Sequence, residues 1–172
     1  MPAVKTGKPN AIPPRQPTEA DLVLLGTAQS AELTVRDLYG AALAAGGFSD
    51  VQQSVLELFH DHHTAYVQTL NGLLGKFATN KLNETLFASF SDQVQSVATA
   101  LPALQSLENI LVATHTDIVG SLVGLDGTNL MASILMVEAR HAAVFGSAPE
   151  MNIEAALNDV AESLITSETV EG

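Results

Sequence analysis

Glutamate and histidine recur along this chain at spacings that could hold metal ions. Glu138 and His141 lie three positions apart, as do Glu57 and His60, and His60 and His63. Residues three apart share one face of an α-helix, so each pair could offer two ligands to the same ion. Carboxylate oxygens and imidazole nitrogens together suit first-row ions such as iron or zinc. The chain contains no cysteine, which excludes iron–sulfur clusters, thiolate zinc sites and cysteine nucleophiles.

Three glutamates fall on helical faces that are otherwise apolar. When each residue is advanced by about 100° around a helix axis, Glu32 lies inside the apolar stripe of its segment. Glu108 and His115 lie inside a second stripe, and Glu138 and His141 lie in the middle of a third. An ionised carboxylate in a core is costly unless it is paired or binds a metal ion. Carboxylates on three such faces therefore indicate one shared, buried site.

A polar core without a metal ion is the alternative to this interpretation. Glu32 or Glu108 could accept a hydrogen bond from Tyr39 or Tyr66, or from an arginine, and Glu138 could form an ion pair with the histidine one turn further along. Such a protein would be a non-catalytic bundle that acts as a binding or assembly module with a partial metal site. Metal content would separate the two hypotheses.

The segment VLELFHDHHTAYVQTL, residues 55–70, offers two ligand registers. His63 faces the apolar stripe of this segment, His60 and His62 lie on its opposite shoulders, and Glu57 lies on the polar face. A Glu-x-x-His reading selects Glu57 with His60, whereas the facing of the side chains selects His60 with His63. We favour the second register, keep Glu57 as a further candidate, and expect His62 to be a shoulder residue without a ligand role.

Composition and local sequence signals predict an all-α protein. Of the 172 residues, 47% are hydrophobic and only 5% are aromatic, and alanine and leucine dominate the apolar set, which favours helices over a β-sandwich. Capping residues, glycines and prolines predict four long helices, at about 18–45, 50–74, 101–124 and 129–145. Shorter helices are expected over about 84–97 and 152–165, and the LDGTN segment (125–129) is expected to be a turn.

The long link between the second and third helices favours one topology. A link of about 25 residues exceeds what neighbouring antiparallel helices need, so it predicts a single long crossover in a four-helix bundle. Residues 1–17 contain five of the seven prolines and are expected to be an extended arm. The bundle, with a short C-terminal helix, is expected over 18–166, followed by an acidic tail at 167–172.

The ordered set of motifs and this crossover resemble the ferritin-like superfamily over residues 19–147. That superfamily places a Glu on each of two helices and a Glu-x-x-His on each of the other two, around a pair of metal ions. The resemblance implies a ferritin-like bundle that binds two iron ions, with manganese or zinc as alternatives. The ligands that it implies here are Glu32, His60, His63, Glu108, Glu138 and His141, with Glu57 and His115 as further candidates.

The resemblance also implies a function and partners. It implies oxidation of Fe(II) by O₂ or peroxide, in a ferroxidase-type or peroxide-consuming protein of iron handling or oxidative-stress defence, assembled as a dimer or larger homo-oligomer. The net charge of −12 argues against nucleic acid and anionic membranes as partners and is compatible with attracting cations. With no long apolar run and no leader in the sequence as given, a cytoplasmic location is expected.

Overall fold

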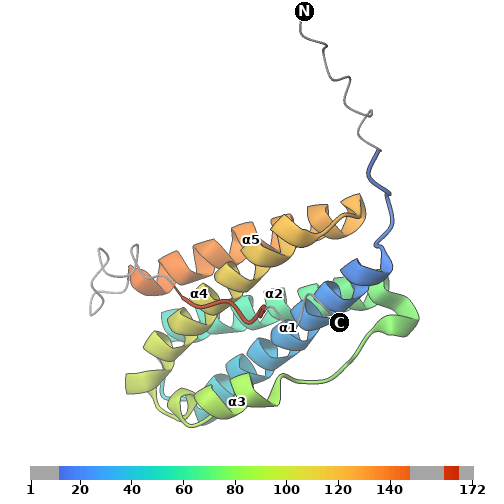
Figure 1. Ribbon diagram of the computed structural model, residues 1–172. Coiled ribbons are helices and arrows are strands. Elements are labelled where there is room, and N and C mark those ends of the chain that lie inside the picture. Colours follow the sequence, from blue (N-terminus) through green and yellow to red (C-terminus); the bar gives the residue numbers. More distant parts are fainter. Residues whose placement is uncertain (1–11, 148–160, 167–172) are drawn as a thin grey trace, which may run out of the picture.

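The computed structural model describes residues 12–147 and 161–166. Every regular element in these ranges is a helix, so the all-α expectation is confirmed (Figure 1). The elements, in chain order, are α1 (Glu19–Ala45), α2 (Asp50–Leu74), η1 (Gly75–Phe77), α3 (Glu84–Phe90), η2 (Gln93–Gln95), α4 (Val97–Ser121) and α5 (Leu125–Gly146). None of these helices is long and apolar enough to cross a membrane.

Capping residues set the ends of the first two helices where the sequence predicts them. Thr18 precedes α1 and forms a capping box with Asp21, each accepting a hydrogen bond from the other's backbone N–H. Ser49 does the same before α2, with Gln52 as its partner. The helix α1 ends at Gly46, whose φ of 71° lies in the left-handed region that glycine adopts without strain.

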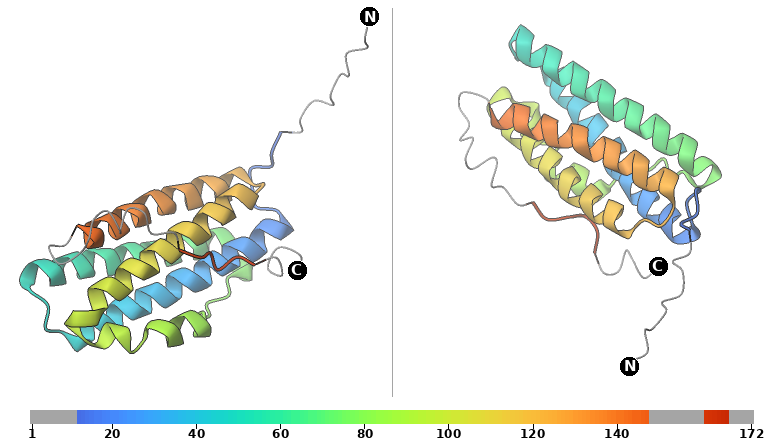
Figure 2. Two further views of the ribbon diagram at one scale, coloured as in Figure 1. Left: turned by 60° about the vertical axis from the view of Figure 1, so that its left-hand side comes forward. Right: turned by 90° about the horizontal axis from the view of Figure 1, so that it is seen from above.

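The four long helices form two hairpins joined by a crossover (Figure 1). The pairs α1–α2 and α4–α5 pack closely, and α1 also packs on α4, whereas α2 and α5 meet only loosely. The crossover, with η1, α3 and η2, runs back along the length of the bundle, so α2 and α4 begin at the same end (Figures 1 and 2). This is the predicted topology, and it places one face of each long helix toward a common interior.

The LDGTN segment is not the expected turn, because it forms the first turn of α5. The exposed N–H groups at a helix start need acceptors. Here the N-terminal arm supplies them: Leu125 N–H donates to Pro14 O at 3.0 Å, and Asp126 N–H donates to Arg15 O at 2.9 Å. A Cβ at Gly124 would lie 2.6 Å from a carbonyl oxygen of the arm, so only glycine allows this approach. A contact more than a hundred residues away in sequence therefore extends the helix.

Two other boundaries differ from the prediction. The helix α4 begins at Val97, one turn earlier than expected, which puts Pro102 in its second turn. The helix expected over 84–97 is divided into α3 and η2. Of the expected C-terminal helix at 152–165, residues 152–160 lie outside the described residues, and 161–166 form no regular element. Most of the arm, 1–11, and the tail at 167–172 also lie outside them.

Two apolar clusters fill the interior and leave a polar layer between them. One cluster contains Leu38, Leu56 and Leu104, and the other contains Leu25 and Ile118 with their neighbours. Along α2, α4 and α5 the predicted ligands lie between members of the two clusters. Apolar packing on both sides excludes water from this layer and strengthens the electrostatic interactions within it.

Candidate metal centre

Six glutamate and histidine side chains from all four long helices meet in the polar layer. Each is at most 2% exposed. They are Glu32 from α1, His63 from α2, Glu108 and His115 from α4, and Glu138 and His141 from α5. Five of the six predicted ligands thus lie together, joined by His115, which was a further candidate.

The structure does not bring His60 and Glu57 into this group. The His60 ring is partly exposed and faces Gly40 of α1, where an added Cβ would lie 3.9 Å from Nε2. Its Nδ1 lies 3.5 Å from Asp61 Oδ1 at the surface. Glu57 is exposed on α2 and accepts a hydrogen bond from Gln53. Both residues therefore lie away from the buried donors.

One part of the centre, here the His63–Glu108 half, consists of His63, Glu108 and His141 with Tyr39. Three donors converge on Glu108 Oε1: the Tyr39 hydroxyl at 2.5 Å, His63 Nε2 at 3.1 Å and His141 Nδ1 at 3.2 Å. The other oxygen, Oε2, has no hydrogen-bond partner in the described part of the chain. Tyr39 therefore makes the bond that the metal-free alternative requires, yet one buried acceptor stays open.

The rest of the centre, here the Glu32–Glu138 half, consists of Glu32, Glu138 and His115. His115 Nδ1 lies 2.6 Å from Glu138 Oε2, and Glu32 Oε2 accepts from His63 Nδ1 at 2.7 Å. Glu32 Oε1, Glu138 Oε1 and His115 Nε2 have no hydrogen-bond partner among the described residues. His115 Nε2 and Glu32 Oε1 are 3.7 Å apart. Two ligands held at about 2.1 Å around one ion would be about 3.4–3.6 Å apart, so this spacing suits a shared cation.

The two halves differ in charge state. Burial raises the pKa of Glu108, but the charge of His63 and hydrogen bonds from His141 and His63 outweigh it and lower that pKa to about 2. Burial opposes the His63 cation, yet Glu108 and Glu32 raise the pKa of His63 to about 10. His63 therefore donates from both ring nitrogens as an imidazolium between two carboxylates.

Glu138 has the opposite behaviour. Burial, then the charge of Glu32, raise the pKa of Glu138 well above its ordinary value. The pKa of Glu32 itself is lowered, because the bond and charge of His63 outweigh burial. The raised pKa favours a protonated Glu138 beside the Glu32 carboxylate, and a bound cation would replace that proton.

His62 is the contact that the sequence interpretation missed. Its Nδ1 lies 2.9 Å from His141 Nε2, and the two rings are stacked with centroids 5.2 Å apart. Phe59 also stacks on His141, with ring centroids 3.8 Å apart, and on His62 at 6.3 Å. In the folded bundle α5 lies beside this shoulder of α2, which brings His62 to His141. The periodicity of a single helix does not show which helix will be its neighbour. His141 thus uses both nitrogens, one toward Glu108 and one toward His62.

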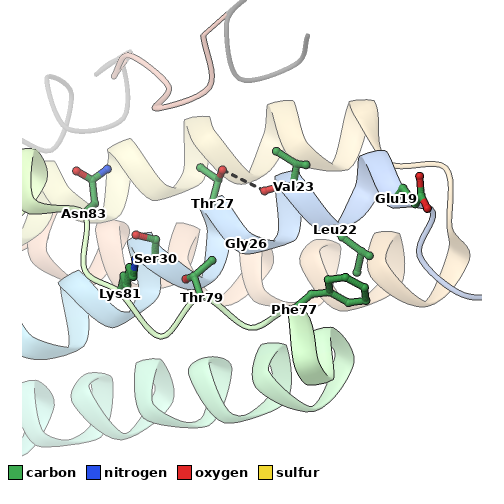
Figure 3. Close-up of a pocket in the computed structure, with 10 residues that line it drawn as sticks. All are labelled: Glu19, Leu22, Val23, Gly26, Thr27, Ser30, Phe77, Thr79, Lys81 and Asn83. Carbon is green, nitrogen blue, oxygen red and sulfur yellow. Dashed lines mark hydrogen bonds between the residues drawn. The ribbon is translucent and has the colours of Figure 1, made fainter. Parts of the chain in front are cut away.

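Two surface hollows lie at different distances from the centre. One of about 750 Å³ lies between α1 and the crossover, with Gly26, Thr79 and Lys81 in its lining, and none of the six buried residues reaches it (Figure 3). A smaller one of about 230 Å³ between α2 and α5 is lined by His62 and His141. Only the smaller of these two therefore contacts the centre.

The residues present fit a metal centre. The donor atoms of His63, Glu108 and His141 lie within 4.8 Å of one another, as do those of Glu32, His63 and Glu138. The profile of the ferritin-like domain family matches residues 20–151, so the chain belongs to that family. This confirms the predicted fold class and superfamily. Comparisons with curated proteins and with solved structures give no match.

Proposed function

We propose that this ferritin-like protein binds two iron ions in its polar layer and oxidises Fe(II) with O₂ or peroxide, in iron handling or oxidative-stress defence. Manganese or zinc are the alternative ions. One observation carries the proposal: Glu32, Glu108 and Glu138, from three helices, each keep one buried oxygen without a hydrogen-bond partner among the described residues, and so does His115 Nε2. Unsatisfied buried polar atoms are costly, and two bound cations would give each of these atoms a partner.

The donors divide between two ion positions. Glu108, His63 and His141 would hold one ion, and Glu32, Glu138 and His115 would hold the other. His63 lies between the two, with a nitrogen toward each half. Three carboxylates supply a charge of −3, one less than a set of four glutamates would supply. The higher share of nitrogen ligands favours iron, zinc or copper over magnesium or calcium.

The chain's own residues manage the protons of this site. Bound iron would supply the one-electron chemistry toward O₂ or peroxide. Glu138 and His63 release their protons when cations bind, because a ligand must offer a free lone pair. Tyr39 holds Glu108 Oε1 in place, which leaves Oε2 directed to an ion. The apolar clusters on both sides keep water from the donors.

Metal content of matched variants tests the proposal. Purified full-length protein is reconstituted anaerobically with Fe(II), desalted, and measured by ICP-MS beside Glu138→Ala and Glu57→Ala. We expect about two ions per chain in the wild type, a loss in Glu138→Ala, and wild-type content in Glu57→Ala, because Glu57 lies on the surface. Protein that holds no metal after reconstitution would leave the non-catalytic bundle that acts as a binding or assembly module.

Oxygen consumption then separates oxidation from passive binding. Fe(II) added to the loaded wild type should consume O₂ faster than the same Fe(II) with Glu138→Ala. Equal rates with retained metal would reject the oxidation chemistry and keep only metal binding. A homo-oligomer and a cytoplasmic location stay predictions, which light scattering and cell fractionation can test.

A further inference from the structure

The buried donors need a route from solvent. The side chains of Glu108 and His63 are 0% exposed, and that of His141 is 2% exposed. An ion that binds them must therefore pass between helices. The backbones within the α1–α2 and α4–α5 hairpins approach each other closely, whereas those of α2 and α5 approach each other at few points and are bridged by side chains.

A pocket opens in this seam beside the centre. Its volume of about 230 Å³ would hold about seven water molecules, which is room for a partly hydrated ion. The pocket is lined by Phe59, His62, Val137, Arg140, His141 and Val144. One of these, His141, also lies 3.2 Å from Glu108, so the inner wall of the pocket is itself part of the centre.

His62 lines the pocket and occupies Nε2 of His141, the residue that forms its inner wall. The hydrogen bond from its ring to His141 and the stacking of Phe59 on His141 form a continuous wall of rings. His62 is only partly buried, unlike the six residues of the centre, so its ring can turn outward. In that position a nitrogen of His62 would be free to take an ion from solvent, and Nε2 of His141 would become free to receive it.

We propose that the α2–α5 pocket is the entrance through which divalent cations reach the buried centre, and that His62 is the residue that opens and closes it. The proposal rests on the metal binding of the proposed function. Arg140 at the rim has a positive charge, and it opposes cation entry locally, whereas the net charge of −12 attracts cations to the protein. We therefore expect the movement of His62, more than electrostatic attraction, to set the rate of cation entry.

Stopped-flow uptake of Co²⁺ by the full-length, metal-free protein tests this route. The visible absorption of Co²⁺ reports its coordination, and EDTA added afterwards gives the release rate. Val144→Trp fills the pocket and should slow uptake by about tenfold. Val123→Trp is the matched control, because Val123 is a similarly exposed valine, 52% against 46%, in the α4–α5 turn. His62→Ala removes the closing ring and should speed both uptake and release by about tenfold.

The two variants therefore move the rate in opposite directions, which a general loss of structure would not do. Circular dichroism confirms that each variant is folded before the rates are compared. Uptake at the wild-type rate in both variants, or an equal slowing by Val123→Trp, would overturn the proposed entrance. A wild type that binds no Co²⁺ at equilibrium would instead overturn the metal binding itself, before any rate is measured.

Discussion

The two halves of the buried centre are satisfied to different degrees by the protein alone. In the His63–Glu108 half, the His63 imidazolium pairs with Glu108, and three donors converge on one oxygen of that carboxylate. In the Glu32–Glu138 half, two carboxyls face each other and one must keep a proton. We expect the ion pair of the first half to stabilise the metal-free fold, and the carboxyl pair of the second half to destabilise it.

This difference indicates in which half a cation would bind more favourably. Binding in the Glu32–Glu138 half replaces a proton held between like groups and provides a partner for His115 Nε2. Binding in the His63–Glu108 half must displace the proton of an imidazolium whose pKa is raised to about 10. We expect the Glu32–Glu138 half to bind the first ion, and three experiments sharpen or break this comparison.

The largest effect is expected from Glu108→Ala. The change leaves the His63 cation without its main partner in a dry interior, and breaking a buried ion pair destabilises a protein by about 3–5 kcal/mol. Urea unfolding of the metal-free protein at pH 7 measures the free energy of unfolding, with Glu57→Ala as the exposed control. A loss of less than about 1 kcal/mol, as for a surface pair, would show that this half is not the structural one.

An effect of opposite sign is expected from Glu138→Gln in metal-free protein. Because folding raises the pKa of Glu138 above 4.5, its contribution to stability is present below pH 4.5 and is lost as pH rises. Glutamine removes that loss, so the variant should be more stable than the wild type at neutral pH and equal to it below pH 4.5. Added metal should stabilise the wild type more than the variant, which keeps only the donors of the His63–Glu108 half. Thermal unfolding in EDTA and with added Fe(II) measures both.

The His63–Glu108 half has a pH dependence of its own, which provides the control for this experiment. Glu108, with a pKa lowered to about 2, stabilises the fold above pH 4.5 and loses that contribution as pH falls toward 2. His63, with a pKa raised to about 10, stabilises it below pH 6.5 and loses that contribution as pH rises toward 10. In Glu138→Gln these two groups should give maximal stability between about pH 4.5 and 6.5. A falling curve in this window would contradict the assignment to Glu138.

The smallest effect is expected from His60→Ala. The ring is partly exposed and faces Gly40 rather than the buried donors, so metal content should stay at the wild-type value. His63→Ala, three residues along the same helix, should lose metal. If ICP-MS shows equal losses in the two variants, the paired register of His60 and His63 is restored and the division into two halves fails.

Helix periodicity was sufficient for most of the fold and for the inward glutamates. A carboxylate on an apolar stripe is visible in a single segment, so Glu32, Glu108 and Glu138 could be predicted to meet. Thr18 and Ser49 fix helix starts by contacts within four residues, and these starts agree with the structure. Properties that depend on a single helix could therefore be predicted from the sequence.

Contacts between helices could not be predicted from the sequence in the same way. The shoulder position of His62 does not say which helix stands beside that shoulder, and only the packed bundle places it against His141. His60, on the opposite shoulder, turns toward α1 for the same reason. The first turn of α5 was missed because Asp126 and Gly127 favour a turn locally, while the acceptors that extend the helix lie in the distant arm.

The caps that the arm gives to α5 also bear on the order of folding. Pro14 and Leu125 are separated by 111 positions, so their contact closes almost the whole length of the bundle as one loop. Closing so long a loop has a high entropic barrier, and contacts of high sequence separation slow folding. The arm leaves the ribosome before α5 but can dock only after α5 has been synthesised. The start of the helix that carries Glu138 and His141 is therefore among the last parts of the protein to become ordered.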